Sequence, residues 1–297
     1  MIIWLASYPR SGNTFFRVLL NSIFSVKSYS IYDERSVIGV NSKMQSVVGY
    51  ELLPNGFDIA SARNSDELFI IKTHDLPNSE TTDKVIYVLR DGRESSLSFC
   101  KYISGYSDQS PKLLDVIYGN TFSGGWSDHV KAWAPNERDN TLLVKFEELT
   151  ADPSRLIKEI ADFIDVTPLS NKIPTFKELK KTNPKFFREG KTDSWKDEYS
   201  ESEHNAFWLR HYQTMIEYGY TSDIPELFQG DEKTIKLVTL LSQENNYYQN
   251  LFFERLKAVS LEINELKNGQ NTMRTSLRKA RKKLKHMFKR GPKQCLR

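Results

Sequence analysis

A short turn near the start of the chain groups side chains that are suited to binding an anion. Residues 7–14 read SYPRSGNT and include one fixed positive charge, Arg10, and one glycine, Gly12. The neutral hydrogen-bonding side chains of the turn are Ser11, Asn13 and Thr14. Guanidinium groups make strong, charge-assisted hydrogen bonds to phosphate oxygens, and neutral donors add to them. The turn is therefore a candidate anion site.

A lysine and a histidine stand two residues apart, directly after the apolar run 68–71. In an extended chain Lys72 and His74 point to the same side. The pKa of histidine suits general-base catalysis near neutral pH, and a lysine ammonium stabilises negative charge on a departing oxygen. The pair indicates a reaction in which a hydroxyl loses its proton as it attacks. A lone histidine is more often structural, so the pair needs further support.

The elements on either side of the turn predict how it is held. An apolar run predicts a strand at 2–7, and an amphipathic pattern from Phe15 predicts a helix at about 14–25. This layout aims backbone N–H groups and a positive dipole end at an anion. The glycines and lysine of a Walker loop and the three spaced glycines of a dinucleotide site are absent from the turn. The alternative is an ordinary strand-to-helix connection with a Ser or Thr N-cap.

Two more apolar runs predict strands at 68–73 and 84–90, and fully apolar strands are typical of a buried parallel sheet. The second strand ends at Arg90, and Asp91 is a predicted N-cap for a helix at 92–104. Open α/β sheets place their sites at the carboxyl ends of their strands. Lys72, His74 and Arg90 are therefore expected at one edge of the sheet.

The rest of the domain gives a coarser pattern. We predict a strand at 141–146, a helix after Asp152-Pro153 and a long helix at 202–218. Residues 26–66 remain unassigned, and 105–125 is expected to be a loop over an acceptor pocket. Two polar residues receive structural expectations: Arg93 is expected to be solvated, and His129 to be a polar residue on a helix rather than a second base.

Four segments, in order over about residues 1–200, resemble those of the cytosolic type of sulfotransferase. They read SYPRSGNTFFR, FIIKTHDLP, VIYVLRDGRESSLSFCKY and FFREGKTDSWKDEYS. The resemblance implies an α/β, P-loop-NTPase-like three-layer fold with a mostly parallel central sheet flanked by helices. It also implies transfer of a sulfuryl group from 3′-phosphoadenosine 5′-phosphosulfate (PAPS) to a hydroxyl or, as second choice, an amine. The product is 3′,5′-bisphosphoadenosine (PAP), and no metal is needed.

The same resemblance implies roles for individual residues. It makes His74 the general base, with Lys72 and Arg10 as the other catalytic residues. The donor-binding residues that it implies are Arg10, Ser11, Gly12, Asn13, Thr14 and Phe15 on the 5′ side, and Arg90, Ser98, Arg188 and Gly190 at the 3′-phosphate. The sequence departs from the family pattern at four positions. It has Arg10 in place of Lys, Phe15 in place of Trp, Phe146 in place of Tyr and Glu189 in place of Lys. These departures bear on the affinity for the donor.

Length and composition fit a globular α/β domain. With 297 residues and 39% apolar side chains, the chain is long enough to bury a large core. Cys100 and Cys295 form neither a disulfide framework nor a metal-ligand spacing. There is no apolar window of eighteen residues and no signal-peptide pattern, so we predict a cytoplasmic location, with peripheral contact at the inner membrane surface as an option.

The C-terminal part has a different character. Apolar residues recur at alternating spacings of four and three over 252–287, apart from Gln270 in the series, which is the pattern of a coiled coil. Twelve of the 42 Lys and Arg residues follow Glu265, after which there is no acidic residue. We predict a sulfotransferase-type domain at 1–225 and a helical extension at 226–297. The extension forms a homo-oligomer, folds back on the domain, or docks on an anionic membrane or acidic partner. Nucleic acid is not favoured, because the tail lacks interleaved aromatic residues.

Two other functions stay open from the sequence. An ATP-dependent small-molecule kinase shares the predicted layout, although the missing Walker lysine argues against it. A non-catalytic, nucleotide-binding scaffold that acts through its C-terminal helix is favoured by Glu189 and Phe146 and opposed by the retained Lys72 and His74. The acceptor itself is not specified: a lipid, a phenol and a glycan all suit the aromatic content.

Overall fold

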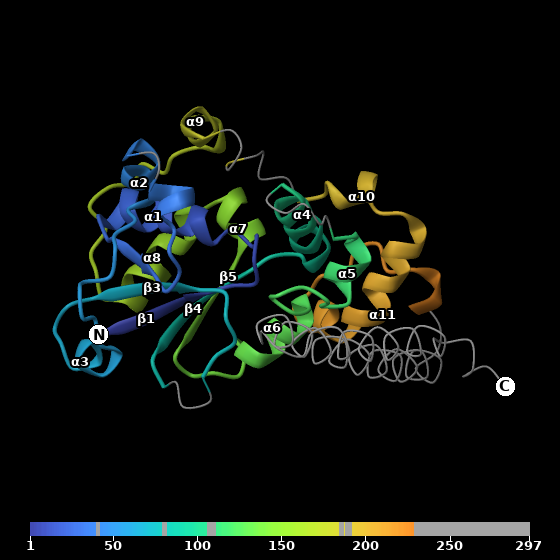
Figure 1. The fold of residues 1–297 in the computed structure, drawn as a ribbon, viewed down its shortest axis with the longest axis horizontal. Helices are drawn as coiled ribbons and strands as arrows, with labels where there is room; N and C mark the ends of the chain where they lie inside the picture. Colours follow the sequence, from blue (N-terminus) through green and yellow to red (C-terminus); the bar gives the residue numbers. More distant parts are fainter. Residues whose placement is uncertain (40–41, 79–81, 106–110, 184–186, 188–191, 229–297) are drawn as a thin grey trace, which may run out of the picture. The chain divides into compact units, whose positions relative to one another are not determined.

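The computed structural model describes residues 1–39, 42–78, 82–105, 111–183, 187 and 192–228 (Figure 1). The chain divides into two units, 1–239 and 240–297, and the second lies wholly outside the described residues. The expected extension over 226–297 lies outside them too, apart from a short 3-10 helix, η2 (Glu226–Phe228). The coiled coil, the basic tail and the boundary at residue 225 therefore stay predictions.

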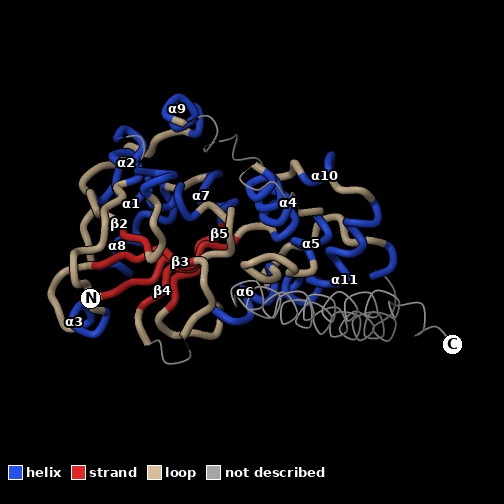
Figure 2. The backbone as a smooth tube through the Cα atoms, in the orientation of Figure 1, coloured by secondary structure: helices blue, strands red, loops and turns tan. Residues whose placement is uncertain are grey.

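Five parallel strands form a central sheet in the order β2–β3–β1–β4–β5 (Figure 2). They are β1 (Ile2–Ala6), β2 (Ser28–Ser30), β3 (Phe69–Thr73), β4 (Lys84–Leu89) and β5 (Thr141–Lys145). In the register, Leu5 pairs with Lys72 on one side and with Ile86 on the other. The predicted fold class is confirmed. Sequence reasoning missed β2, because its three residues, SYS, contain no apolar run.

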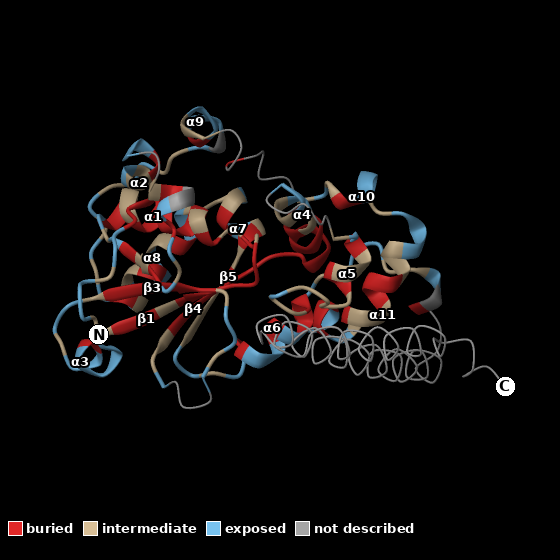
Figure 3. Cartoon of the chain, viewed as in Figure 1, coloured by how far each residue is buried: buried red, intermediate tan, exposed pale blue. Residues whose placement is uncertain are grey.

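Helices cover both faces of the sheet, so the domain has three layers (Figure 3). Alternate strand residues point to opposite faces: Ile86 and Val88 pack in one core, and Tyr87 and Leu89 in the other. The first core is shared by α1 (Asn13–Phe24), α2 (Ser42–Val48), α7 (Phe146–Ala151), α8 (Ser154–Ile164) and α9 (Phe176–Thr182). The second is shared by α4 (Gly92–Ser104), α5 (Leu113–Ile117), α6 (Trp126–Trp133), α10 (Trp195–Glu198) and α11 (Glu201–Glu217). A smaller core beside β3 contains α3 (Ile59–Arg63).

The first helix shows how the sequence pattern becomes packing. Phe16, Leu19, Leu20 and Ile23 recur at helical spacing, and all four are fully buried. Burial of each such side chain contributes about 1.5–3 kcal/mol. The helix ends at Phe24, and its C-cap Ser25 has a left-handed φ of 56° and donates its backbone N–H to the last turn. Anchored in this way, α1 presents a fixed N-terminus to the edge of the sheet.

Two regions contain more regular structure than the sequence indicated. The expected loop 105–125 includes α5, so that expectation is wrong for part of its length. A helix of five residues is too short for a clear periodicity, although three of its four apolar residues are buried. The unassigned region 26–66 contains β2, a π-helix η1 (Arg35–Gly39), α2 and α3. This region forms one wall of the site described below.

The expectation that Arg93 is solvated is wrong. Its guanidinium is buried, lies 2.6 Å from the Asp91 carboxylate and sits 3.9 Å from the ring centre of Trp195. It also donates to the backbone carbonyl of Ser222 at 2.7 Å. A cation is stable there because an ion pair and an aromatic face replace its hydration. Arg93 thereby ties the end of the domain to the start of α4.

Candidate active site at the carboxyl edge of the sheet

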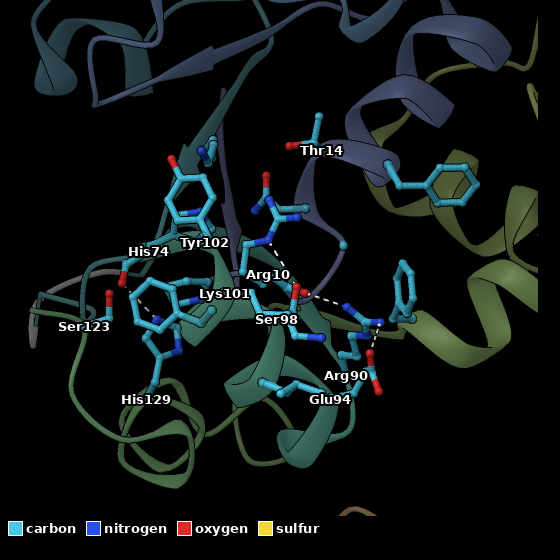
Figure 4. Close-up of a pocket in the computed structure, with 18 of the residues that line it drawn as sticks. Arg10, Thr14, His74, Arg90, Glu94, Ser98, Lys101, Tyr102, Ser123 and His129 are labelled. Carbon is cyan, nitrogen blue, oxygen red and sulfur yellow. Dashed lines mark hydrogen bonds and ion pairs between the residues drawn. The ribbon is translucent and has the colours of Figure 1, made fainter. Parts of the chain in front are cut away.

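A cavity of about 890 Å³ lies at the carboxyl ends of β1, β3 and β4 (Figure 4). Its lining comes from the β1–α1 turn, the residues that follow β3, the inner face of α4 and the loop before α6. Lys72, His74 and Arg90, which the sequence predicted at one edge, all line it. A cavity of this size is within the range that binds a ligand as large as a nucleotide.

The β1–α1 turn has a backbone that requires glycine at one position. Gly12 has a left-handed φ of 98°, and a Cβ placed on it would lie 2.2 Å from the ring of Phe146. The same residue is the N-cap of α1, which receives no side-chain capping hydrogen bond. Thr14 and Phe15, in the first turn of the helix, line the cavity. The N-terminus of α1 is thus available as a backbone anion site.

The side chains of the turn divide into two groups. Arg10 lines the cavity, donates from Nε to Ser98 Oγ at 3.3 Å and stacks over Tyr102 (Figure 4). Ser11 and Asn13 were predicted as neutral donors to an anion, and both side chains make hydrogen bonds within the protein. The Ser11 hydroxyl lies 3.2 Å from that of Ser95, and the Asn13 amide donates to a β1 carbonyl at 3.1 Å. These two side chains hold the turn in place.

Arg90 and Ser98, which the sequence predicted at the 3′-phosphate, lie beside Arg10. Arg90 donates to the Arg10 carbonyl at 2.9 Å, and its guanidinium lies 4.4 Å from the centre of the Phe146 ring. Glu94, one helical turn along α4, is 3.4 Å from Arg90 (Figure 4). The two remaining predicted residues of this group, Arg188 and Gly190, lie outside the described residues, as does Glu189.

His74 is held in the orientation of a general base. Its Nδ1 is 2.8 Å from the backbone carbonyl of Ser7. Because a carbonyl only accepts, Nδ1 is assigned the proton, and Nε2 therefore has the free lone pair. Burial lowers the pKa of His74 well below its usual 6.5, and the nearby charge of Lys72 lowers it further. The imidazole is thus neutral at pH 7 and able to accept a proton.

Lys72 belongs to a buried chain of charges. Its ammonium forms an ion pair with Glu34, whose other oxygen lies 2.7 Å from the guanidinium of Arg17. All three residues are at least nine-tenths buried. Burial lowers the pKa of Lys72, against the opposing charge of Glu34. Sequence reasoning missed Glu34, because an acidic residue in an unassigned segment carries no motif.

Tyr32 is a second residue of the site without a sequence signal. Its hydroxyl accepts the backbone N–H of His74 at 2.8 Å and donates to the Asp75 carboxylate at 2.8 Å. Its ring is nearly parallel to the imidazole, at 18°. Tyr32 therefore fixes both the backbone and the ring of His74.

His129 lies next to His74 but uses both ring nitrogens in hydrogen bonds. Its Nδ1 is 2.8 Å from the hydroxyl of Tyr87, and its Nε2 is 3.2 Å from the backbone carbonyl of His74 (Figure 4). Burial lowers its pKa to about 4, so the ring is neutral at pH 7. This arrangement supports the backbone of His74 and leaves neither nitrogen as a base.

The open side of the cavity is partly apolar. The side chains of Leu76 and Phe122 line it and are 59% and 82% exposed. Phe122 packs edge-on against Phe99. Within the described residues, no group of three or more His, Cys, Asp or Glu side chains is arranged to hold a metal ion. The same part of the chain contains no helix that is long and apolar enough to cross a membrane.

Comparison with known proteins gives a consistent match. The family described as the sulfotransferase domain matches residues 2–219. Sulfotransferase 1B1 of Mus musculus is 29% identical over 56% of this chain, an alignment that spans 58% of the mouse protein. The 3-alpha-hydroxysteroid sulfotransferase of Cavia porcellus is 22% identical over 76% of this chain and 86% of its own length. Mouse sulfotransferase SULT7A1, solved in complex with PAP, has a TM-score of 0.53 at 19% identity, covering 74% of this chain and 88% of that chain.

Proposed function

The chain belongs to the sulfotransferase family, and from that premise we propose that it transfers a sulfuryl group from PAPS to an acceptor hydroxyl. The observation that carries the proposal is the geometry of His74, whose proton-bearing Nδ1 is tied to Ser7 while Nε2 is left as a base beside Lys72. The acceptor oxygen forms a bond to sulfur as the bond from sulfur to the bridging oxygen breaks. The acceptor proton passes to His74 Nε2, and the electron pair of the broken sulfur–oxygen bond leaves with PAP.

The cations of the cavity receive roles from the same proposal. Lys72 and Arg10 stabilise the negative charge that develops on the bridging oxygen, because fixed charges in a buried site act strongly on the transition state. The backbone N–H groups at the start of α1 bind the 5′-phosphosulfate. Arg90 and Ser98 bind the 3′-phosphate, with Arg188 and Gly190 as further proposed contacts, and Phe15 faces the adenine. A guanidinium suits a phosphate dianion, since its fork donates two hydrogen bonds.

The two alternative functions left open by the sequence are no longer equally supported. An ATP-dependent kinase is not favoured, because the matching family is that of sulfotransferases. A scaffold with an inactive nucleotide site remains the second candidate only through Phe146 and Glu189, where the sequence departs from the family. The ring of Phe146 packs against the guanidinium of Arg90 and supports it by a cation–π contact.

Calorimetric titration with PAP, AMP and magnesium-ATP tests the proposal. We expect PAP to bind at least about a hundredfold more tightly than AMP, a difference of about 2.7 kcal/mol. In Arg90→Ala this preference disappears while AMP affinity is retained. Preference for magnesium-ATP would favour the kinase, and absence of nucleotide binding would favour the scaffold. Turnover is then followed as PAP formed from PAPS, with 4-nitrophenol, a steroid alcohol, a monosaccharide or water as acceptor.

The acceptor and the partners are proposed in coarser terms. The family implies an acceptor substrate, and we propose a small molecule, a lipid or a glycan with a hydroxyl group. The partly apolar rim at Leu76 and Phe122 supports an acceptor with an apolar face. We also propose a cytoplasmic location, supported by the absence of a disulfide pattern for the two cysteines. Homo-oligomer formation through 252–287 and docking of the basic tail on an anionic membrane stay proposals from the sequence.

A further inference from the structure

The buried charges behind the cavity carry an inference about a residue with no assigned role. We propose that Glu34 is a positioning residue for sulfuryl transfer, which holds Lys72 at the cavity and maintains its positive charge. This inference rests on the proposed function, because it takes from it the electrostatic role of Lys72. Glu34 acts through Lys72 and does not itself take part in the transfer.

Glu34 has two fixed partners, one on each carboxylate oxygen. Oε1 accepts from the Lys72 ammonium, and Oε2 accepts from Arg17 Nη1 at 2.7 Å. Arg17 is completely buried and donates from Nε to Ser28 Oγ at 2.7 Å, which ties it to β2. The carboxylate is therefore anchored on α1 and β2, and Lys72 is held at the opposite end. The anchor is independent of any ligand.

The charges around Lys72 explain why it needs an acidic partner. Arg17 on α1 and Arg10 on the turn face it with like charge, the ring of Tyr32 lies 5.6 Å away, and His74 is two residues along the chain. Burial lowers the pKa of Lys72, and the two arginines lower it further. Glu34 opposes these effects by charge and hydrogen bond. Without Glu34, Lys72 would lose its proton at a lower pH and no longer stabilise a departing oxygen.

Glu34 is unsuited to act as a base in place of His74. Burial alone would raise its pKa, but the charges of Arg17 and Lys72 reverse this and hold the pKa below its usual value. Both of its oxygens are also occupied by cations. A carboxylate in this state keeps its negative charge and does not exchange protons near neutral pH. Its contribution is the location and charge of the lysine.

The first experiment replaces the charge while keeping the shape. Glu34→Gln is expected to lower kcat for PAP formation about tenfold at pH 7.5. Its PAP affinity, measured by calorimetry, stays within about threefold of the original. In Glu34→Gln the alkaline limb of the pH profile, where kcat falls as the pH rises, begins at a lower pH than in the unmodified protein. Glu34→Asp, which keeps a carboxylate, shifts this limb back to higher pH. The matched control is Glu51→Gln, which removes an exposed carboxylate outside the cavity and leaves the profile unchanged.

A double-mutant cycle with Lys72→Met separates positioning from a merely structural role. If Glu34 acts through Lys72, the double variant is no slower than Lys72→Met alone. A further loss in the double variant, or an unshifted alkaline limb in Glu34→Gln, overturns the inference. Should Glu34→Gln fail to fold by circular dichroism, Glu34→Asp carries the same cycle.

The cycle also distinguishes this inference from the proposed function. Lys72→Met is expected to lower kcat about a hundredfold with little change in PAP affinity. If Lys72→Met is slow but Glu34→Gln behaves like the unmodified protein, the proposed function stands and the role of Glu34 is refuted. If Lys72→Met keeps full turnover, the electrostatic role of Lys72 fails, and the inference fails with it.

Discussion

The two walls of the cavity hold their cations in different ways. On the α4 wall, Arg90 lies 3.4 Å from Glu94, four residues later in the first turn of α4, and donates to the backbone of Arg10. On the β3 wall, Lys72 is held by Glu34, which precedes it by 38 residues and is itself anchored by Arg17. The first arrangement combines an ion pair between near neighbours in sequence with a hydrogen bond to a distant backbone carbonyl. The second depends on three buried side chains from separate segments.

The difference shows how sensitive each wall is to substitution. A backbone carbonyl that accepts from Arg90 survives any change of side chain at Arg10. Lys72 and the backbone N–H of His74, by contrast, are held by the side chains of Glu34 and Tyr32, although the His74 ring also contacts the Ser7 carbonyl. Removing one partner from a buried ion pair leaves an uncompensated charge, which costs more than the pair itself contributes. The β3 wall should therefore respond more strongly to single substitutions that leave the donor site intact.

The largest expected effect is at His74. His74→Ala is expected to lower kcat for PAP formation about a thousandfold, because a positioned general base contributes about 10²- to 10⁴-fold. PAP affinity should change by less than about threefold, since the ring is placed as a base and not as an anion ligand. Full turnover with unchanged PAP binding would refute the base assignment and remove the functional contrast between the walls.

The pH profile gives a second readout for the same residue. His74 must be neutral to accept a proton, and burial holds its pKa well below 6.5. Activity should therefore persist at pH 6.5 and fall only when the pH drops through that lowered pKa. The matched control is His204→Gln, a histidine stacked on Trp195 outside the cavity, which should leave kcat unchanged. An acid limb centred at or above 6.5 would contradict the buried, neutral imidazole.

The next largest effect is expected at Gly12, where the β1–α1 turn contacts Phe146 of α7. Gly12→Ala places a methyl group 2.2 Å from Phe146 and forces a left-handed φ of 98° on alanine. We expect PAP affinity to fall about a hundredfold and stability to fall by about 2 kcal/mol. Calorimetry and thermal unfolding measure the two effects.

Gly56→Ala is the control for this substitution. Gly56 has a similar φ of 73° but nothing within 4 Å of an added Cβ. Gly56→Ala should therefore lose the stability that a left-handed φ costs an alanine, without any steric clash, and should keep its PAP affinity. Equal effects of the two variants would show that strain in φ, and not contact with Phe146, makes Gly12 necessary.

Much of the fold was predictable from the sequence because its strands are continuous apolar runs. The strands predicted at 2–7, 68–73, 84–90 and 141–146 each end within one residue of the observed strand. Parallel strands covered on both faces need such runs. Short elements carry no comparable signal, which explains why β2 and α5 were missed. The family assignment was also predictable, and it is confirmed by the match over residues 2–219.

The site was predictable where its residues follow one another in a motif. Lys72, His74 and Arg90 were expected at one edge of the sheet, and they line one cavity. Residue type alone does not give side-chain partners: the Ser11 hydroxyl lies beside that of Ser95 and the Asn13 amide donates to a β1 carbonyl, and the roles of both residues at an anion stay predictions. Partners distant in sequence were not predictable either. Nothing near Glu34 or Tyr32 indicates contacts about 40 residues away, and the burial of Arg93 depends on an aromatic ring about 100 residues later.

The smallest expected effect is at Tyr32. Tyr32→Phe keeps the ring that lies parallel to His74 and removes the hydroxyl that joins the His74 N–H to Asp75. A lost hydrogen bond of this kind costs about 1 kcal/mol, which corresponds to about a fivefold fall in kcat. PAP affinity should be unaffected. Tyr29→Phe, the same change on β2 at a residue that packs against Phe69 outside the cavity, is the control.

The outcome at Tyr32 decides what holds His74, the proposed base, on the β3 wall. A fall of about fivefold assigns its position jointly to the ring contact and the hydroxyl. Unchanged kcat would mean that the Tyr32 ring and the Ser7 carbonyl are enough to hold His74. The β3 wall would then depend less on side-chain hydrogen bonds than the ion pair of Lys72 with Glu34 indicates. A fall beyond about a hundredfold exceeds the loss of one neutral hydrogen bond. The Tyr32 hydroxyl would then have to act on the transferred proton, and the wall would contain a second catalytic group.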